Sequence, residues 1–249
     1  MDKNKNEKNG IEDLLTQMEQ IPDDYEPDSR YFEINEFSNA IDSLKRVHAF
    51  LSILDDPFRW KWVSISLVNA LYGLMICVLR VGNYKAVIDF DKMDKKSMKN
   101  LTKLRESSLT KDFIEARRLE NKFIDSRGGV LISFIDALER IQDEEFMKKY
   151  SANKTIEISA SEKANILELR KTFRNQFEHY RPLSWMIDQR VFIPMVRDTL
   201  SIIKKLLNSF NLKIHSATWN IKDAILLCIR TEKLLAENEK NLDSKSPSQ

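Results

Sequence analysis

Arginine, asparagine and histidine side chains stand close together in the stretch FRNQFEH, residues 173–179. The imidazole of His179 has an unperturbed pKa near ~6.5, so it can accept or donate a proton at neutral pH. The forked guanidinium of Arg174 can bind and stabilise negative charge on oxygen atoms. Asn175 can orient a bound anion or the imidazole. These three residues are the candidate catalytic set, and their types suit acid–base chemistry at an anionic group.

Positive charge surrounds this set. The residues that we expect to contact a nucleic acid are Arg170, Lys171 and Arg181. Residues 1–36 contain four basic and eleven acidic residues, a net charge of −7, which leaves +9 for the rest of the chain. A moderately basic folded part attracts a polyanion by steering. This excess of positive charge is compatible with binding of RNA or DNA, but it does not demonstrate either.

A helical wheel predicts which way the set faces. The apolar residues that fall within about 40° of one another on the wheel are Ile166, Leu169, Phe173, Phe177 and Tyr180. This face is expected to lie against a core. Arg174 then lies on the flank at ~100°, and Asn175 and His179 lie at ~200° and ~240°, away from the core. The wheel therefore predicts that the polar set faces water, a ligand or a second protein surface.

Each of the three polar residues also has an ordinary interpretation. Arg174 and Glu178 are four residues apart and can form an ion pair on the helix surface. Asn175 can be a solvated surface residue. His179, in the last turn before Pro182, can interact favourably with the carbonyl end of the helix.

The spacing Arg174-Asn175-x-x-x-His179 resembles the R-x(4–6)-H signature of the HEPN superfamily (higher eukaryotes and prokaryotes nucleotide-binding domains), with its polar residue after the arginine. The longer pattern R-N-x-F-x-H-x-x-P-x-x-W, residues 174–185, is similar to that of a group of bacterial HEPN-like proteins. The segment WKWVSISLVNALYGLMICVL, residues 60–79, resembles part of the same proteins. When the order of the helices along the chain is compared, the resemblance extends over about residues 31–235.

The resemblance implies an all-α bundle that forms a homodimer, in which two copies of the motif line a shared cleft. Many members of the superfamily are ribonucleases that need no metal or other cofactor, and many are toxins or defence effectors. The implied partners are therefore RNA, a second copy of the chain and an antitoxin protein. RNA carries its own nucleophile, the 2′-hydroxyl. His179 would then move the proton, Arg174 would stabilise phosphoryl charge, and the second copy would supply a second histidine.

The sequence also departs from one branch of the superfamily. In toxins that an adenylyltransferase partner inactivates, a tyrosine lies two places after the histidine, where this chain has Arg181. Other members have lost activity and act as binding modules. A non-catalytic module that binds nucleic acid or a protein through the same cleft is therefore the alternative to a ribonuclease. A structural helical protein whose polar set is a solvated face is a third reading.

Other catalytic and metal-binding patterns are missing from the sequence. It contains neither a phosphate-binding G-x-x-x-x-G-K-[ST] motif nor G-x-G-x-x-G, and it has no serine nucleophile elbow. His48 and His215 have no neighbours with metal-ligand spacing. Cys77 and Cys228 lie in apolar helical surroundings, which predicts buried free thiols in a reducing compartment rather than a disulfide or zinc site.

The elements that must position the set are long helices. The chain has only five glycines and six prolines in 249 residues, so few turns are available for a sheet fold. Apolar periodicity and helix breakers predict helices over about 31–54, 58–80, 130–141, 159–180, 186–210 and 219–241. The segment at 58–80 is apolar enough to suggest a membrane span on length alone, but a central helix covered on all sides fits better.

The predicted organisation is an all-α HEPN-like bundle of four to five long helices over residues 31–241, with an irregular charged insertion at about 84–127. An acidic, mobile leader is expected at residues 1–30, and a polar tail at 242–249. The stretch Asp143–Ser159 reads as a hydrophilic linker. The N-terminus has no apolar segment of the secretory type, so we expect a cytoplasmic protein without membrane contact.

Overall fold

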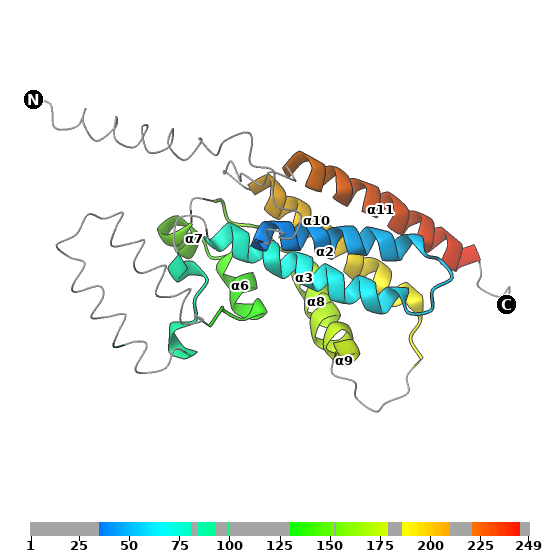
Figure 1. Ribbon diagram of the computed structural model, residues 1–249, viewed down its shortest axis with the longest axis horizontal. Coiled ribbons are helices and arrows are strands. Elements are labelled where there is room, and N and C mark those ends of the chain that lie inside the picture. Colours follow the sequence, from blue (N-terminus) through cyan, green and yellow to red (C-terminus); the bar gives the residue numbers. More distant parts are fainter. Residues whose placement is uncertain are drawn as a thin grey trace, which may run out of the picture. The chain divides into compact units, whose positions relative to one another are not determined.

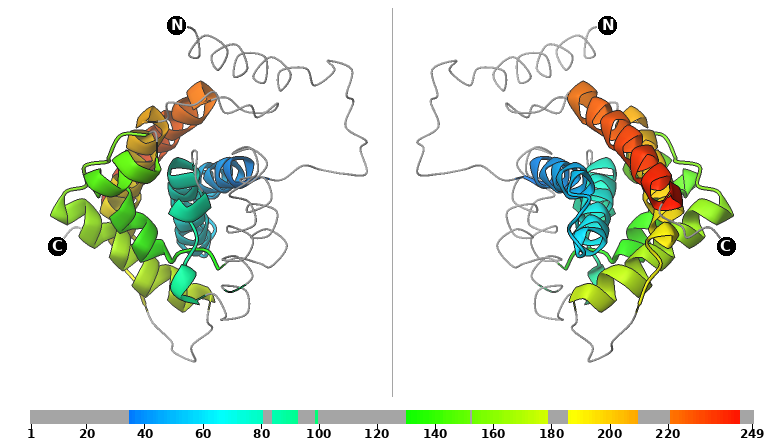
Figure 2. Two further views of the ribbon diagram at one scale, coloured as in Figure 1. Left: turned by 90° about the vertical axis from the view of Figure 1, so that its left-hand side faces the viewer. Right: turned by 90° about the vertical axis from the view of Figure 1, so that its right-hand side faces the viewer.

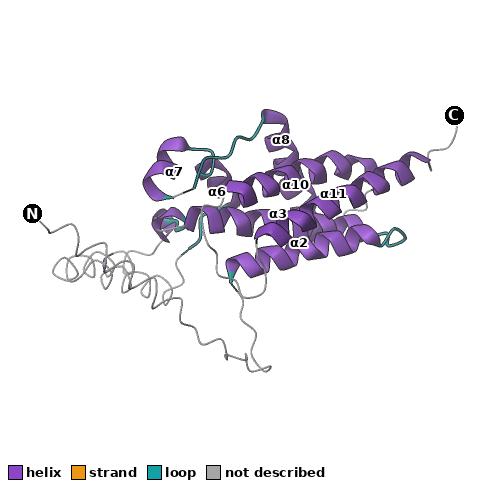
Figure 3. Cartoon of the chain, turned by 90° about the horizontal axis from the view of Figure 1, so that it is seen from above, coloured by secondary structure: helices purple, strands orange, loops and turns teal. Residues whose placement is uncertain are grey.

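The computed structural model of the protein describes residues 35–80, 84–92, 99, 130–151, 153–178, 186–209 and 221–244. Figure 3 shows this part of the chain as helices joined by loops. The only strand-like pairing among the described residues is an isolated antiparallel bridge between Ile88 and Leu131. The predicted all-α class is confirmed. The predicted leader at 1–30 and the insertion residues 93–98 and 100–127 lie outside the described residues.

Helices α2 (Glu36–Ser52) and α3 (Arg59–Arg80) form an antiparallel pair that lies side by side in Figures 1 and 3. Asn35 begins α2 with a capping box, in which its side chain accepts from the Ser38 N–H at 2.8 Å. The two helices approach closely at Gly73, where a Cβ atom would lie 2.9 Å from the Cβ of Ala40. A glycine at this position therefore allows the contact.

Helix α3 is the centre of the bundle. It packs against α2, α10 (Phe192–Ser209), α6 (Phe134–Arg140) and the segment Leu169–Arg174. By length and composition it is the one described helix that could cross a membrane, but 61% of its most apolar window is buried inside the protein. The side chains of Leu67, Leu71 and Leu74 are fully covered. This burial is what the core helix of a bundle requires.

The other two long helices of the bundle are α10 (Phe192–Ser209) and α11 (Ile221–Ser244). Helix α10 packs against α3 and α11, and α11 packs against α2. Figure 2 shows this arrangement from two sides. Side chains link α11 to α2, because His48 Nδ1 lies 3.2 Å from Thr231 Oγ1 and Asn238 Nδ2 donates to the Leu51 carbonyl at 3.1 Å. Helix α11 extends three residues beyond the predicted end of the domain at 241.

The predicted linker between 143 and 159 is wrong in part, because it contains helix α7 (Glu144–Tyr150). Asp143 caps this helix by accepting from the Phe146 N–H at 2.9 Å. Met147 anchors it in the core and is 1% exposed. A helix of seven residues is too short to show a clear apolar period, so its sequence reads as polar. A helix was predicted over 130–141, and the structure has the shorter helix α6 there.

A continuous helix, named here the motif helix, spans residues 160–178 and carries Arg174 and Asn175 of the candidate catalytic set. It consists of α8 (Ala160–Glu168), the π-helical segment η3 (Leu169–Arg174) and α9 (Asn175–Glu178). Ser159 caps it through a capping box with Glu162. Ile166, Leu169 and Phe173 are buried, as the wheel predicts, and Phe177 packs at the edge of the core.

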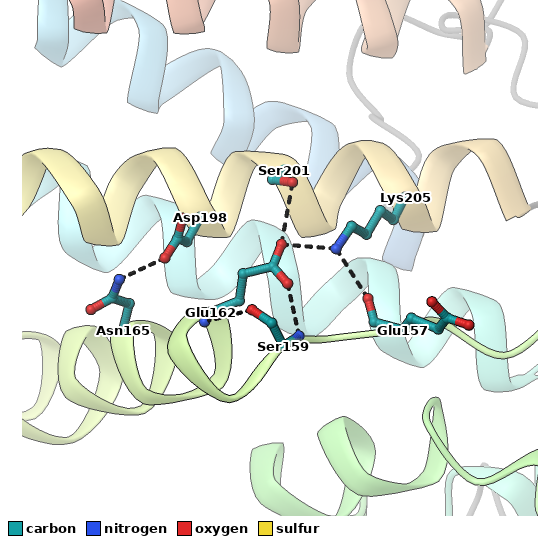
Figure 4. Close-up of polar contacts among 7 residues, drawn as sticks. All are labelled: Glu157, Ser159, Glu162, Asn165, Asp198, Ser201 and Lys205. Atoms are coloured by element: carbon teal, nitrogen blue, oxygen red, sulfur yellow. Dashed lines mark hydrogen bonds and ion pairs between the residues drawn. The ribbon is translucent and has the colours of Figure 1, made fainter.

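Polar contacts fasten the start of the motif helix to α10 (Figure 4). The carboxylate of Glu162 accepts from Lys205 Nζ at 2.8 Å, and the same Nζ donates to the Glu157 carbonyl at 3.0 Å. Asn165 Nδ2 donates to Asp198 Oδ2 at 2.6 Å. These contacts hold the motif helix on α10, while its segment Leu169–Arg174 packs against α3.

Candidate anion-binding site

The middle of the motif helix departs from α-helical geometry. At Asn175 the backbone N–H donates to the carbonyl of Arg170, five residues earlier, instead of the usual four. Such π-helical turns are rare and occur frequently at functional sites. The wide turn contains both arginines of the motif helix, Arg170 and Arg174. The sequence thus places its two guanidinium groups where the helix is irregular.

Arg174 is held by its neighbours on the same helix. Its Nη2 lies 2.8 Å from Glu178 Oε2, and its Nη1 donates to Asn175 Oδ1 at 3.1 Å. The Nε atom is buried and has no hydrogen-bond partner among the described residues. An unsatisfied buried N–H is costly unless a ligand or a water molecule accepts from it. Both Nη atoms of this guanidinium therefore have partners, whereas its Nε–H has none among the described residues.

Arg170 lies beside Arg174 and faces an aromatic ring. Its guanidinium carbon lies 5.0 Å from the centroid of the Phe134 ring, which is cation–π distance. No carboxylate among the described residues pairs with it. Burial, and next the charge of Arg174, lower the pKa of Arg170 below its ordinary value. The positively charged guanidinium groups of Arg170 and Arg174 therefore repel each other, and an anion bound between them would reduce this repulsion.

The two arginines line a pocket between α3 and the motif helix. Its volume is about 380 Å³, within the roughly 300–1,000 Å³ range of small-molecule sites. The lining is mixed and contains three cations, several apolar side chains and a few neutral polar groups. It consists of Val68, Asn69, Tyr72, Lys92, Leu131, Ile132, Ser133, Phe134, Arg170 and Arg174.

Tyr72 and Phe134 form a fixed wall of this pocket. Tyr72 donates its hydroxyl proton to the Ile132 carbonyl at 2.5 Å, and its ring centroid lies 6.0 Å from that of Phe134. Burial raises the pKa of Tyr72 above 10.0, and Arg170 partly opposes this shift. The hydroxyl is therefore protonated at neutral pH. Lys92 reaches the rim, where its Nζ lies 2.6 Å from Asp89 Oδ2.

An aromatic stack holds the motif helix in place behind the pocket. The ring of Phe173 lies 4.6 Å from that of Phe192, centroid to centroid, and Phe192 stacks on Trp60 at 5.3 Å. Gln189 Oε1 accepts from both Trp60 Nε1 at 2.9 Å and Arg59 Nη2 at 2.8 Å. The stack and these hydrogen bonds connect the motif helix, α10 and the start of α3.

The structure brings together part of the predicted set. Arg174 contacts Asn175, and Arg170 joins Arg174 at the pocket. Lys171 is exposed and is not among the residues that line the pocket. His179 and Arg181 lie outside the described residues, as do Tyr180, Pro182 and Trp185.

Sequence reasoning missed the pocket residues that come from other segments. Asn69 and Tyr72 belong to α3, and Ser133 and Phe134 come from the start of α6. The one signal available is that Asn69 and Tyr72 carry polar groups within the long apolar segment of α3, and Ser64 and Ser66 do so as well. Among the described residues no group of three or more histidine, cysteine or acidic side chains is arranged to hold a metal ion.

Comparison of the chain with protein-family models, with curated proteins and with solved structures gave no match.

Proposed function

We propose that the protein is a metal-independent endoribonuclease of a cellular defence or stress system, and that it acts as a homodimer. The proposal depends on one observation, that Arg170 and Arg174 line the same pocket. Arg174 also contacts Asn175. Guanidinium groups that converge in a partly buried site bind phosphate oxygens. The rest of the proposal depends on His179, four residues after Asn175 in the sequence.

In the proposed reaction the imidazole of His179 removes the proton from a ribose 2′-hydroxyl. The oxygen then attacks the adjacent phosphorus, and the bond from phosphorus to the 5′-oxygen of the next nucleotide breaks. A second histidine, from the other copy of the chain, protonates that leaving oxygen. Arg174 stabilises the charge on the phosphoryl oxygens, and Asn175 orients the guanidinium through the contact already made.

The test is cleavage of RNA by the purified protein in EDTA. We expect His179→Ala to reduce the rate by about 10²–10⁴, the usual contribution of a general acid or base. His48→Gln is the matched control, because His48 is a half-buried histidine that contacts α11 through Thr231. Equal cleavage by the wild type and His179→Ala would exclude the proposal. Sedimentation velocity reports whether both proteins form the dimer.

A second candidate is a non-catalytic module that binds RNA, DNA or an antitoxin-type protein through the same residues. The ion pair between Arg174 and Glu178 favours it, since a catalytic arginine is more effective when no internal carboxylate neutralises it. This module would bind an RNA oligonucleotide without turnover at any protein concentration. Its binding would weaken in Arg174→Gln, and His179→Ala would leave it unchanged.

A further inference from the structure

The pocket between α3 and the motif helix is larger than a phosphate group requires. Its cationic side is formed by Arg170 and Arg174, with Lys92 at the rim. The rest of its lining combines the polar groups of Asn69, Tyr72 and Ser133 with apolar side chains. The apolar residues include Val68, Ile132 and Phe134, all nearly inaccessible to solvent. A ligand that fits such a site has a compact anionic group and an attached apolar or aromatic part.

We infer that this pocket binds a small organic phosphate monoester, with the phosphate between Arg170 and Arg174 and the organic part against the wall of Val68, Ile132 and Phe134. A monoester carries about −1.5 to −2 charges at pH 7 and offers three acceptor oxygens. Two adjacent guanidinium groups match this charge and geometry.

The carboxylates near the pocket determine which of its cations an anion can bind. Lys92 is paired with Asp89, and Arg174 is paired with Glu178. Asp136, which also lies near Tyr72, already accepts from the Ser133 backbone N–H at 3.0 Å. Arg170 is therefore the cation of the pocket without a carboxylate partner among the described residues. A phosphate would bind Arg170 first and compete with Glu178 for Arg174.

The test is isothermal titration calorimetry of the full chain at low salt with phenyl phosphate, inorganic phosphate and phenol. We expect phenyl phosphate to bind at one site, at least about tenfold more tightly than inorganic phosphate. Burial of roughly 60 Å² of ring surface is sufficient for that factor. Phenol lacks the charge and should give no measurable binding. Equal affinities for phenyl and inorganic phosphate would overturn the assignment of an organic ligand.

Two variants locate the binding. Arg170→Gln should weaken phenyl phosphate binding by about tenfold or more, because a charge-assisted contact is lost. Asn69→Asp places a negative charge on the exposed pocket residue of α3 with almost no change in shape, and it should also weaken binding. Arg230→Gln in α11 and Asn39→Asp in α2 are matched exposed controls that should bind as the wild type does. Circular dichroism verifies that each variant is folded.

A free organic phosphate and the phosphorylated end of a nucleic acid share this chemistry. A short deoxyoligonucleotide with and without a 5′-phosphate distinguishes the two sources. Neither this probe nor phenyl phosphate carries the 2′-hydroxyl needed for cleavage, so the measurement is independent of the proposed ribonuclease activity. Tighter binding of phenyl phosphate than of inorganic phosphate, or binding of the 5′-phosphorylated but not the unphosphorylated oligonucleotide, supports the inference. It is overturned if neither binds, or if Arg170→Gln and Asn69→Asp bind as tightly as the wild type.

Discussion

The guanidinium of Arg174 and the carboxylate of Glu178 form an ion pair along the motif helix, with 2.8 Å between Nη2 and Oε2. Both side chains are 29% exposed, and the arginine precedes the glutamate, which is the weaker orientation of such a pair. The pair therefore contributes only a few tenths of a kcal/mol to stability. Its larger consequence is that it occupies donors that a phosphate would use.

Replacing Glu178 by glutamine should strengthen phosphate binding. The competing pair is worth about 0.2–1 kcal/mol, so we expect the affinity for phenyl phosphate to rise by up to about fivefold. Calorimetry measures the change. Glu144→Gln is the control, because Glu144 forms the same type of pair with Lys148 in α7 and does not line the pocket. Weaker binding by Glu178→Gln would show that Glu178 helps to hold the ligand.

Gly73→Ala should destabilise the fold although alanine is the better helix former. The change gains about 1 kcal/mol of helix propensity. The new methyl group would lie 2.9 Å from the Cβ of Ala40, so α2 and α3 must separate, and such overpacking costs about 1–3 kcal/mol. We expect a net loss of up to about 2 kcal/mol in urea denaturation.

A double-mutant cycle tests the origin of that loss. In the background of Ala40→Gly the space opposite position 73 is free, so Gly73→Ala should become neutral or stabilising. A penalty of the same size in both backgrounds would show that contact with Ala40 is not its cause.

Glu162→Gln should make stability less dependent on pH. Burial raises the pKa of Glu162, but the hydrogen bonds from Lys205 and Ser159 lower it by more, and the result lies below the ordinary value of 4.5. A group with a lowered pKa in the folded state contributes stability above pH 4.5, and this contribution is lost as the pH falls through the folded-state pKa.

We therefore expect Glu162→Gln to lower the free energy of unfolding by about 1 kcal/mol at pH 7, and the difference from the wild type to disappear toward pH ~3. Urea denaturation at several pH values measures it. Glu168→Gln, an exposed change in the same helix, should follow the wild type at every pH. A difference that stays constant down to pH ~3 would contradict the role of the charge.

The two thiols should be unreactive in the folded protein. Burial raises the pKa of Cys77 and of Cys228 to about 12, so almost no thiolate exists at pH 8. We expect a disulfide reagent such as Ellman's reagent to modify neither thiol rapidly in buffer and both in urea. Rapid modification of one thiol in buffer would indicate that its helix opens locally.

The long helices could be predicted from the sequence because their apolar residues recur at three- and four-residue steps. The second helix was expected over about 58–80, and the structure has Arg59–Arg80. The break before it, at Asp55-Asp56-Pro57, is also visible in the sequence. Helix α7 was missed since a single buried residue, Met147, anchors its seven residues.

The candidate site could be predicted only in part. The wheel assumes 3.6 residues per turn, and the bond between the Asn175 N–H and the Arg170 carbonyl breaks that assumption. A π-helical turn has no sequence signature that periodicity detects. Tyr72 lies about 100 residues before Arg170 in the chain and Phe134 about 40 residues before it, so only the packing of α3 and α6 shows that they face Arg170.

The aromatic stack makes Trp60 a built-in spectroscopic reporter. Its indole is 3% exposed and stacks on Phe192, which in turn contacts Phe173 in the turn that carries both arginines. A shift of that turn by a fraction of an ångström would change the surroundings of the indole. In a variant whose other three tryptophans are replaced by phenylalanine, emission from Trp60 would follow occupancy of the pocket without any attached label.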